Sequence, residues 1–494
     1  MTRTVAPFDA QARLWRHGAP SPRRSAVHAL SLLAVWLTVA SGAVVFTEPA
    51  PVDALTIGLV ILLPVVGLAR ITPPLLLYLC LWLLVMAGGY IASIASDELG
   101  VAVTHTSISL YLALASFIIA AFVAQNPKAH TALILHAYLW AGMIASTLAL
   151  IGYFDLLPYA GELFTKFGRA SGTFKDPNVF GPFLIPPLLY AVHLVTTRRF
   201  SGTLLPLVGC VVLTLAILLS FSRGAWLALA IAGLLYGFCA FITAPTNRQR
   251  LKLLTLALIG LVGALAILVM ALQVDKVSEL MEQRASLSQS YDEGPEGRFG
   301  GQAKAVGLIL DHPFGIGAMA FSQRFHNEAP HNVYLAMFLN AGWFGGLAHL
   351  LLIILTLSLG WRHVFKRHPS QPLYLVAFAS LVAMMVEGAV IDTDHWRHFY
   401  LLMGLCWGLM MGARGGPARQ PRASTINRRA MIIDPQLVIP RRPRKHLRRP
   451  PRLVARTPGR KPRRPVQMRP VPRRNLQRHA RRNPRLIVAR RQRR

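Results

Sequence analysis

The stretch LLLYLCLWLLVMAGGYIASIA, residues 75–95, decides the fold class of this chain. It contains no charged residue, and its length matches the ~20 apolar residues that an α-helix needs to cross a bilayer. Backbone polar groups find no partner in hydrocarbon, so a run of this kind must be helical. Similar runs recur along the chain, which predicts an all-α polytopic membrane bundle of about twelve helices. We place the spans at about 26–46, 54–69, 75–95, 104–124, 131–151, 179–197, 203–220, 225–243, 253–273, 332–358, 371–391 and 398–413.

Lysine and arginine set the orientation of these spans. The N-terminal segment 1–25 is rich in arginine and is therefore assigned to the cytoplasm. Alternation from there gives two sizeable outer loops, at 152–178 and 274–331. Of the 20 Asp and Glu residues, only Asp9 and Asp434 then fall inside. The acids were not used to set the orientation, so their distribution supports this topology independently.

The net charge of +33 is concentrated in one part of the 494-residue chain, which is otherwise 53% hydrophobic. Residues 414–494 hold 28 Lys and Arg against one acid, Asp434. We divide the chain into a cytoplasmic segment 1–25, a transmembrane domain 26–413 and an Arg/Pro-rich cytoplasmic tail 414–494 that we expect to be disordered. Each Lys or Arg near a cytoplasmic leaflet contributes about 1 kcal/mol of attraction to anionic lipid. Lipid binding is the favoured interpretation, nucleic-acid binding is the runner-up, and an extension from misread coding sequence is the third.

Small residues within the spans bear on helix packing. The last span reads Gly404-xxx-Gly408-xxx-Gly412, and small residues one turn apart let another helix approach closely. Packing inside the bundle is the favoured interpretation, and dimerisation is the alternative. All four cysteines lie within spans and none is in a CxxC motif, so we expect buried thiols rather than disulfides or metal ligands. They are Cys80, Cys210, Cys239 and Cys406.

Four polar segments lie at span ends or in loops on the outer side. They are GRASGTFKDPNVFG (168–181), SFSRGAWLAL (220–229), GRFGGQAKAVGLILDHPFGIGAMAF (297–321) and PHNVYL (330–335). Within the third, GQAKAVGLIL (301–310) predicts a short amphipathic helix, which DHPFGIG (311–317) ends with a proline and two glycines. Charged groups so close to hydrocarbon are costly and are usually kept for function. The candidate site residues in these segments are Arg169, Arg223, Arg298 and His331.

In this order, the four segments resemble the O-antigen ligase and polymerase superfamily of bacterial envelope glycosyltransferases. Members carry a G-R-x-S/T-G-x-F-x-x-P-N segment, an S-R-G-A-W turn, a long outer loop ending in D-H-P-x-G-x-G, and then H-N-x-Y-L. The resemblance covers roughly residues 160–410. It implies transfer of a glycan from undecaprenyl diphosphate to an acceptor outside the inner membrane, without metal, nucleotide or other cofactor.

The candidate residues suit that chemistry. A diphosphate leaving group gains negative charge in the transition state, and guanidiniums stabilise it by paired hydrogen bonds to phosphate oxygens. We assign this role to Arg223 and Arg298, with Arg169 as a third contact to phosphate or sugar. The acceptor hydroxyl needs a base, for which the imidazole of His331 is suited. Asn332 orients that imidazole or binds sugar. The predicted reaction is an inverting transfer, with lipid A–core ligation and glycan polymerisation as alternatives that share a donor.

A second group of acids follows near the end of the eleventh span. Glu387 precedes Asp392-Thr-Asp394, which His395 and Arg397 follow. A DxD tripeptide at a membrane surface can hold Mg²⁺ or Mn²⁺ on a diphosphate, but such tripeptides arise often by chance. We favour the interpretation that these acids pair with the arginines or bind sugar hydroxyls of the acceptor.

The sequence also bears on two other classes of membrane protein. The chain contains no GxxxxGK[ST] motif, which argues against work driven by ATP. It also lacks a pair of interrupted helices with embedded acids, the usual sign of an ion-coupled transporter. A membrane transporter of polysaccharide is retained as the alternative of a different class.

The topology is tested by a reporter fusion at residue 290. We expect the reporter to behave as periplasmic, because residue 290 lies in the second predicted outer loop. Activity in alkaline phosphatase and silence in a fluorescent cytoplasmic reporter would agree. Cytoplasmic behaviour would contradict the topology and each site assignment that depends on it.

Overall fold

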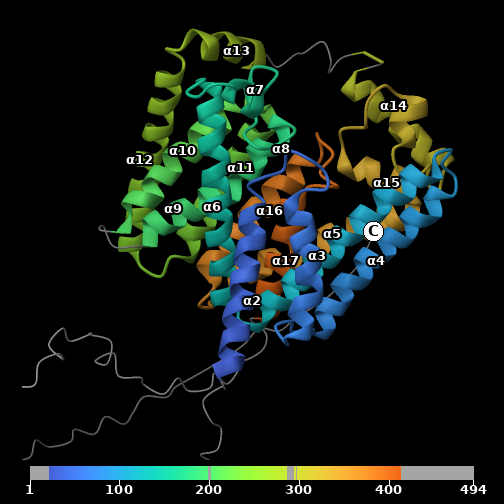
Figure 1. Cartoon of the computed structure of the whole chain (residues 1–494), viewed down its shortest axis with the longest axis horizontal. Helices are drawn as coiled ribbons and strands as arrows, with labels where there is room; N and C mark the ends of the chain where they lie inside the picture. The colour runs from blue at the N-terminus through green and yellow to red at the C-terminus, as the bar shows by residue number, and fades with distance from the viewer. Residues whose placement is uncertain (1–21, 198–201, 286–293, 296, 413–494) are drawn as a thin grey trace, which may run out of the picture. The chain divides into compact units, whose positions relative to one another are not determined.

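The computed structural model describes residues 22–197, 202–285, 294–295 and 297–412. Within these residues the fold is built almost entirely of α-helices (Figure 1). The helices that correspond to predicted spans are α2 (Pro22–Ser41), α3 (Pro51–Val65), α4 (Pro73–Ser93), α5 (Leu99–Gln125), α6 (Pro127–Tyr153), α8 (Pro177–Phe183), α9 (Ile185–Thr197), α10 (Leu204–Leu219), α11 (Arg223–Thr243), α12 (Asn247–Ala271), α15 (Val333–Val364), α16 (Gln371–Glu387) and α17 (Arg397–Gly412). Both termini of the chain, including the predicted basic tail 414–494, lie outside the described residues.

Seven stretches are long and apolar enough to cross a membrane, counting α8 and α9 together. The others are α4, α5, α6, α11, α12 and α15. Four shorter apolar helices lie within α2, α3, α10 and α16. The predicted all-α, multi-pass membrane class is thus confirmed, whereas the count of twelve spans stays a prediction.

The two outer loops contain short elements of their own. The first holds α7 (Ala160–Phe164) and a two-stranded antiparallel hairpin, β1 (Thr165–Lys166) and β2 (Arg169–Ala170). The second holds α13 (Asp275–Ala285), α14 (Arg298–Asp311) and the π-helical turn η2 (Phe321–Phe325). The helix predicted over 301–310 is part of α14, which ends at Asp311 as predicted. Residues 286–293 and 296 of the predicted polar loop lie outside the described residues.

Side-chain caps place two candidate residues at helix starts. The Ser222 hydroxyl accepts the N–H of Ala225, so α11 begins at Arg223. The Asn332 side chain accepts the N–H of both Tyr334 and Leu335, so α15 begins directly after it. Such caps supply acceptors to amides that the first helical turn leaves unpaired.

The glycines of the last span pack inside the bundle, as favoured from the sequence. A Cβ at Gly404 would lie 2.5 Å from the backbone oxygen of Ser116, and one at Gly408 would lie 2.6 Å from that of Ala120. Both oxygens belong to α5, along which α17 packs. The glycines therefore let two backbones approach closely.

The cysteines depart in part from expectation. All four are free thiols, so no disulfide joins them. Cys239 and Cys406 are buried, but Cys210 is half-buried and Cys80 is exposed. The prediction of burial is wrong for Cys80, which lies on an exposed part of α4.

Replacing Gly408 with alanine should destabilise the bundle. The new methyl group would meet backbone rather than a flexible side chain, and overpacking of this kind typically costs about 1–3 kcal/mol. We expect a lower unfolding midpoint for Gly408→Ala in detergent. Gly233→Ala is the matched control, since a Cβ at Gly233 in α11 meets nothing within 4 Å. Equal midpoints for the two variants would contradict the packing described.

Candidate functional site

A cavity of about 250 Å³ gathers most of the candidate residues. Arg169, Arg223, Arg298, His331 and Glu387 all line it, although they come from β2, α11, α14, the start of α15 and the end of α16. We call it the arginine cavity. Its remaining lining residues are Asn178, Phe221, Ser222, Gly224, Arg284, Glu328, Val390 and Ile391. Four guanidiniums around one cavity create a strongly positive site that suits an anion of more than one charge.

Arg169 joins two segments of the cavity wall. Its Nε donates to the backbone oxygen of Ser220 at 2.7 Å, and its Nη2 donates to Oδ1 of Asn178 at 2.7 Å. Only 4% of the residue is exposed. Arg169 therefore holds the turn before α11 against α8, which makes it a positioning group as well as a cavity-lining cation.

The turn that carries Arg223 is tightly constrained. Phe221 has a positive φ of 47°, and its side chain is buried beneath the turn. A Cβ at Gly224 would lie 2.7 Å from Oε1 of Glu387, so a larger residue here would displace that carboxyl from its position beside the start of α11. These features explain the Ser-Arg-Gly pattern: serine caps the helix, arginine faces the cavity and glycine makes room for Glu387.

His331 is held in a defined orientation by two acids and the neighbouring backbone. Its φ is 49°, a left-handed conformation that costs energy for a non-glycine residue and often occurs at functional sites. Its Nε2 lies 3.0 Å from Oε2 of Glu328, and its Nδ1 lies 3.6 Å from Oδ2 of Asp392. The backbone N–H of Val333 donates to the oxygen of Gly388 and anchors the start of α15 to the end of α16.

Two cavity residues, Glu328 and Arg284, were not identified from the sequence. Glu328 sits three residues before His331 and contacts its ring, so a search for carboxylates beside the candidate base would have found it. Arg284 comes from the last turn of α13. No sequence motif indicated Arg284, because it lies in an outer loop that has little regular sequence pattern.

Glu387 is the most deeply buried acid of the cavity. Only 2% of it is exposed, and neither carboxyl oxygen has a hydrogen-bond partner among the described residues. A buried carboxylate without partners is costly. The residue is therefore ready to accept hydrogen bonds from a ligand or to carry a proton.

The two aspartates of the DxD tripeptide have separate partners. The Oδ2 and Oδ1 atoms of Asp392 accept the backbone N–H of His331 and Asn332 at 3.1 and 3.2 Å. Asp394 contacts Nε2 of His105 at 3.2 Å. Arg397, which follows the tripeptide, does not pair with either aspartate but forms a two-pronged pair with Asp53 at 2.6 and 2.8 Å.

The electrostatic environments of these aspartates also differ. Burial, together with the nearby charge of Asp394, raises the pKa of Asp392. Burial alone would also raise the pKa of Asp394, but the hydrogen bond from His105 and the nearby imidazoles lower it to about 2. Asp394 is thus ionised near neutral pH, whereas Asp392 is protonated more easily, because burial and the charge of Asp394 outweigh the effects of His331 and the two backbone amides.

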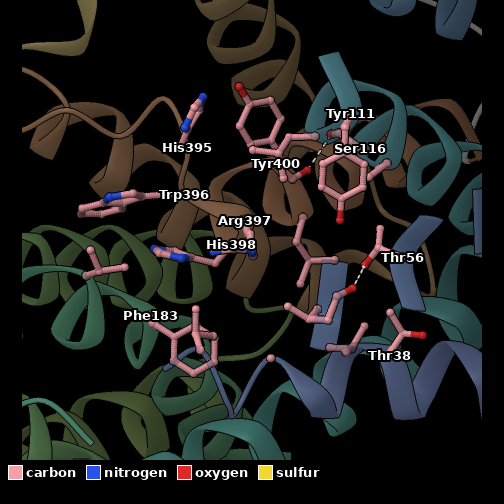
Figure 2. A pocket seen from close by; sticks show the side chains of 18 of the residues that line it. Thr38, Thr56, Tyr111, Ser116, Phe183, His395, Trp396, Arg397, His398 and Tyr400 are labelled. Carbon is pink, nitrogen blue, oxygen red and sulfur yellow. Dashed lines mark hydrogen bonds between the residues drawn. The ribbon is translucent and has the colours of Figure 1, made fainter. Parts of the chain in front are cut away.

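Asp392 and Asp394 line a second cavity, of about 310 Å³, which has largely apolar walls from α2, α3, α5, α6, α8 and α17. We call it the apolar cavity. Figure 2 shows the aromatic rings of Phe183, Trp396 and Tyr400 around it, with Arg397 beside them. The structure thus divides the predicted site residues between two cavities. Asn332 lines neither, because its side-chain oxygen caps α15.

Residues 208–350 match the family model described as O-antigen ligase. This segment is similar to the O-antigen ligase family. The match includes Arg223, Arg298 and His331, and it confirms the resemblance to the O-antigen ligase and polymerase superfamily. No curated protein matches the chain.

Removing the Asp392 carboxylate should loosen the start of α15. Asp392→Ala leaves two backbone amides without their acceptor, and each unsatisfied group costs about 1–3 kcal/mol. We expect faster amide hydrogen exchange in peptides that cover residues 328–336. Asp392→Asn, which keeps one acceptor oxygen, should show a smaller increase. Unchanged exchange in Asp392→Ala would mean that these two hydrogen bonds do not hold the segment.

Proposed function

We propose that this O-antigen ligase-type protein transfers a glycan from undecaprenyl diphosphate to an acceptor at the periplasmic face of the bacterial inner membrane. The observation that carries the proposal is the arginine cavity, in which Arg223, Arg298 and His331 lie together. The family match supports a ligase- or polymerase-type function in general terms, with a lipid-linked glycan as donor and a lipid A–core or another glycan as acceptor.

The arginines act on the donor. Arg223 and Arg298 bind the diphosphate and stabilise the charge that it gains as its bond to the sugar breaks. A guanidinium suits this role because its planar fork donates two parallel hydrogen bonds to phosphate oxygens. Arg284 and Arg169 add positive charge, and Arg169 also holds the Ser220 turn in place. With this charge supplied by side chains, transfer proceeds without a metal ion or nucleotide.

His331 acts on the acceptor. Its imidazole takes the proton from the acceptor hydroxyl as the oxygen attacks the anomeric carbon. The bond between that carbon and the diphosphate oxygen breaks, and the electron pair leaves with the diphosphate. One displacement from the opposite face inverts the anomeric configuration. Glu328 fixes the ring by its contact with Nε2, as a carboxylate commonly orients a catalytic histidine.

The remaining candidate residues have supporting roles. Glu387 accepts hydrogen bonds from sugar hydroxyls, because its carboxyl is buried at the cavity without a partner among the described residues. Asn332 positions His331 through the cap of α15. Asp392 also positions His331, whereas Asp394 binds acceptor from the apolar cavity.

Envelope glycan analysis after deletion distinguishes the alternatives. Loss of long chains from lipopolysaccharide, with intact lipid-linked polymer, indicates a ligase, which is our proposal. Products limited to a single repeat indicate a polymerase. Lipid-linked glycan trapped on the cytoplasmic side would contradict transferase function and support a transporter.

Conservative changes in the arginine cavity should abolish most transfer. Arg223→Lys and Arg298→Lys keep the charge but lose the planar fork, and loss of one preorganised contact typically lowers the rate about 10²–10³-fold. His331→Ala should lower it about 10²–10⁴-fold if the imidazole is the base. The measurement is transfer of a lipid-linked glycan by purified protein in the presence of EDTA.

Arg324→Lys is the matched control for these changes. Arg324 lies in the same outer loop but forms an ion pair with Asp97 at the surface, so its replacement should be tolerated. Full activity of both Arg223→Lys and His331→Ala, in correctly inserted protein, would eliminate the mechanism. Transfer that EDTA abolishes and Mg²⁺ restores would move the chemistry to Asp392 and Asp394.

A further inference from the structure

Two histidines and an aspartate form a compact cluster outside the arginine cavity. His105 comes from α5, whereas Asp394 and His395 come from the loop between α16 and α17. One ligand atom from each lies within 4.8 Å of the others. Nε2 of His105 is 3.2 Å from Oδ2 of Asp394, and the two imidazole rings stack with their centroids 4.0 Å apart. Residues almost 290 positions apart are thus brought together by folding.

The hydrogen bonds of His395 leave the lone pair of one ring nitrogen available to bind a ligand. Its Nε2 lies 2.9 Å from the Ser109 hydroxyl and 3.2 Å from the backbone oxygen of His105. The carbonyl oxygen only accepts, so Nε2 carries the proton, and Nδ1 then holds the lone pair. This pattern is typical of metal-binding histidines, whose second nitrogen usually donates to a carbonyl or carboxylate that orients the ring.

We propose that His105, Asp394 and His395 bind a divalent transition-metal ion such as Zn²⁺. Two imidazoles and one carboxylate are a common ligand set for these ions. Bonds to zinc are about 2.0–2.2 Å long, so the three side chains would close around the ion from their present spacing of up to 4.8 Å. Mg²⁺ and Ca²⁺ are disfavoured, because they prefer oxygen ligands.

Binding of the ion would displace the proton through which Nε2 of His105 now contacts Asp394.

This site is distinct from the Mg²⁺ or Mn²⁺ site that the DxD tripeptide suggests. Asp392 is not part of the cluster, since both of its carboxylate oxygens accept backbone amides. Asp394 and His395 line the apolar cavity, whereas Arg223, Arg298 and His331 line the arginine cavity. An ion held by three protein ligands keeps coordination positions for water or for an oxygen ligand in the apolar cavity. It does not contact the diphosphate in the proposed mechanism, because the arginine cavity binds that group and contains none of the three ligands.

The test is Zn²⁺ binding by the full-length protein, purified in detergent with a histidine-free tag and stripped with chelator. Calorimetry and metal analysis should show one equivalent of Zn²⁺ that the double variant His105→Ala/His395→Ala does not bind. Asp394→Asn should bind at least about 10-fold more weakly, and Ser109→Ala, which loses only an orienting contact, about 10-fold more weakly. Excess Mg²⁺ should leave the bound equivalent in place.

The control is His312→Ala, which removes an exposed histidine after α14 and should bind like the wild type. Equal Zn²⁺ stoichiometry and affinity in the wild type and the double variant would overturn the proposal. If the double variant is unstable, Asp394→Asn decides, because it keeps the size and most contacts of the side chain. Unchanged affinity in that variant would mean that Asp394 only pairs with His105 and does not bind the ion. This result would also overturn the proposed site. Because the readout is binding, the result does not depend on whether the transfer mechanism is correct.

Discussion

The two hydrogen bonds to the Asp392 carboxylate connect the arginine cavity with the apolar cavity. They attach the backbone of His331 and Asn332 to the loop after α16, while the N–H of Val333 donates to Gly388 of the same segment. His331 keeps its strained left-handed conformation because these hydrogen bonds to the surrounding structure hold its backbone in place. The imidazole consequently lies in the arginine cavity, and the carboxylate that holds its backbone lines the apolar cavity. The geometry of both cavities depends on this junction.

The charge distribution explains why the two cavities differ. The arginine cavity collects four guanidiniums and two acids from segments scattered over more than 200 residues. Its excess positive charge is suited to an anionic ligand. In the apolar cavity the charges largely compensate one another, since Arg397 pairs with Asp53 and Asp394 contacts His105. An apolar lining with a polar end suits an amphipathic molecule. The separation agrees with a transferase that brings a charged leaving group and a second, lipid-like ligand to one membrane face.

Much of this arrangement could be predicted from the sequence, for identifiable reasons. Membrane spans can be recognised from their length and apolar composition. Polar residues at the ends of spans then stand out, and these are Arg169, Arg223, Arg298 and His331. The pairing of Arg397 with Asp53 could not be predicted, because the residues are 344 positions apart and neither belongs to a motif. The same holds for His105 and Asp394. The sequence also suggested that Asp392 and Asp394 act together, whereas the turn between α16 and α17 gives them different partners.

The proposed mechanism requires that the diphosphate of the donor binds in the arginine cavity. The most direct measurement is a structure of the protein in a lipid nanodisc with undecaprenyl diphosphate bound. Phosphate oxygens should lie within hydrogen-bonding distance of Arg223 and Arg298, on the same side as His331. A diphosphate bound instead in the apolar cavity, beside Arg397 and Lys175, would contradict this mechanism.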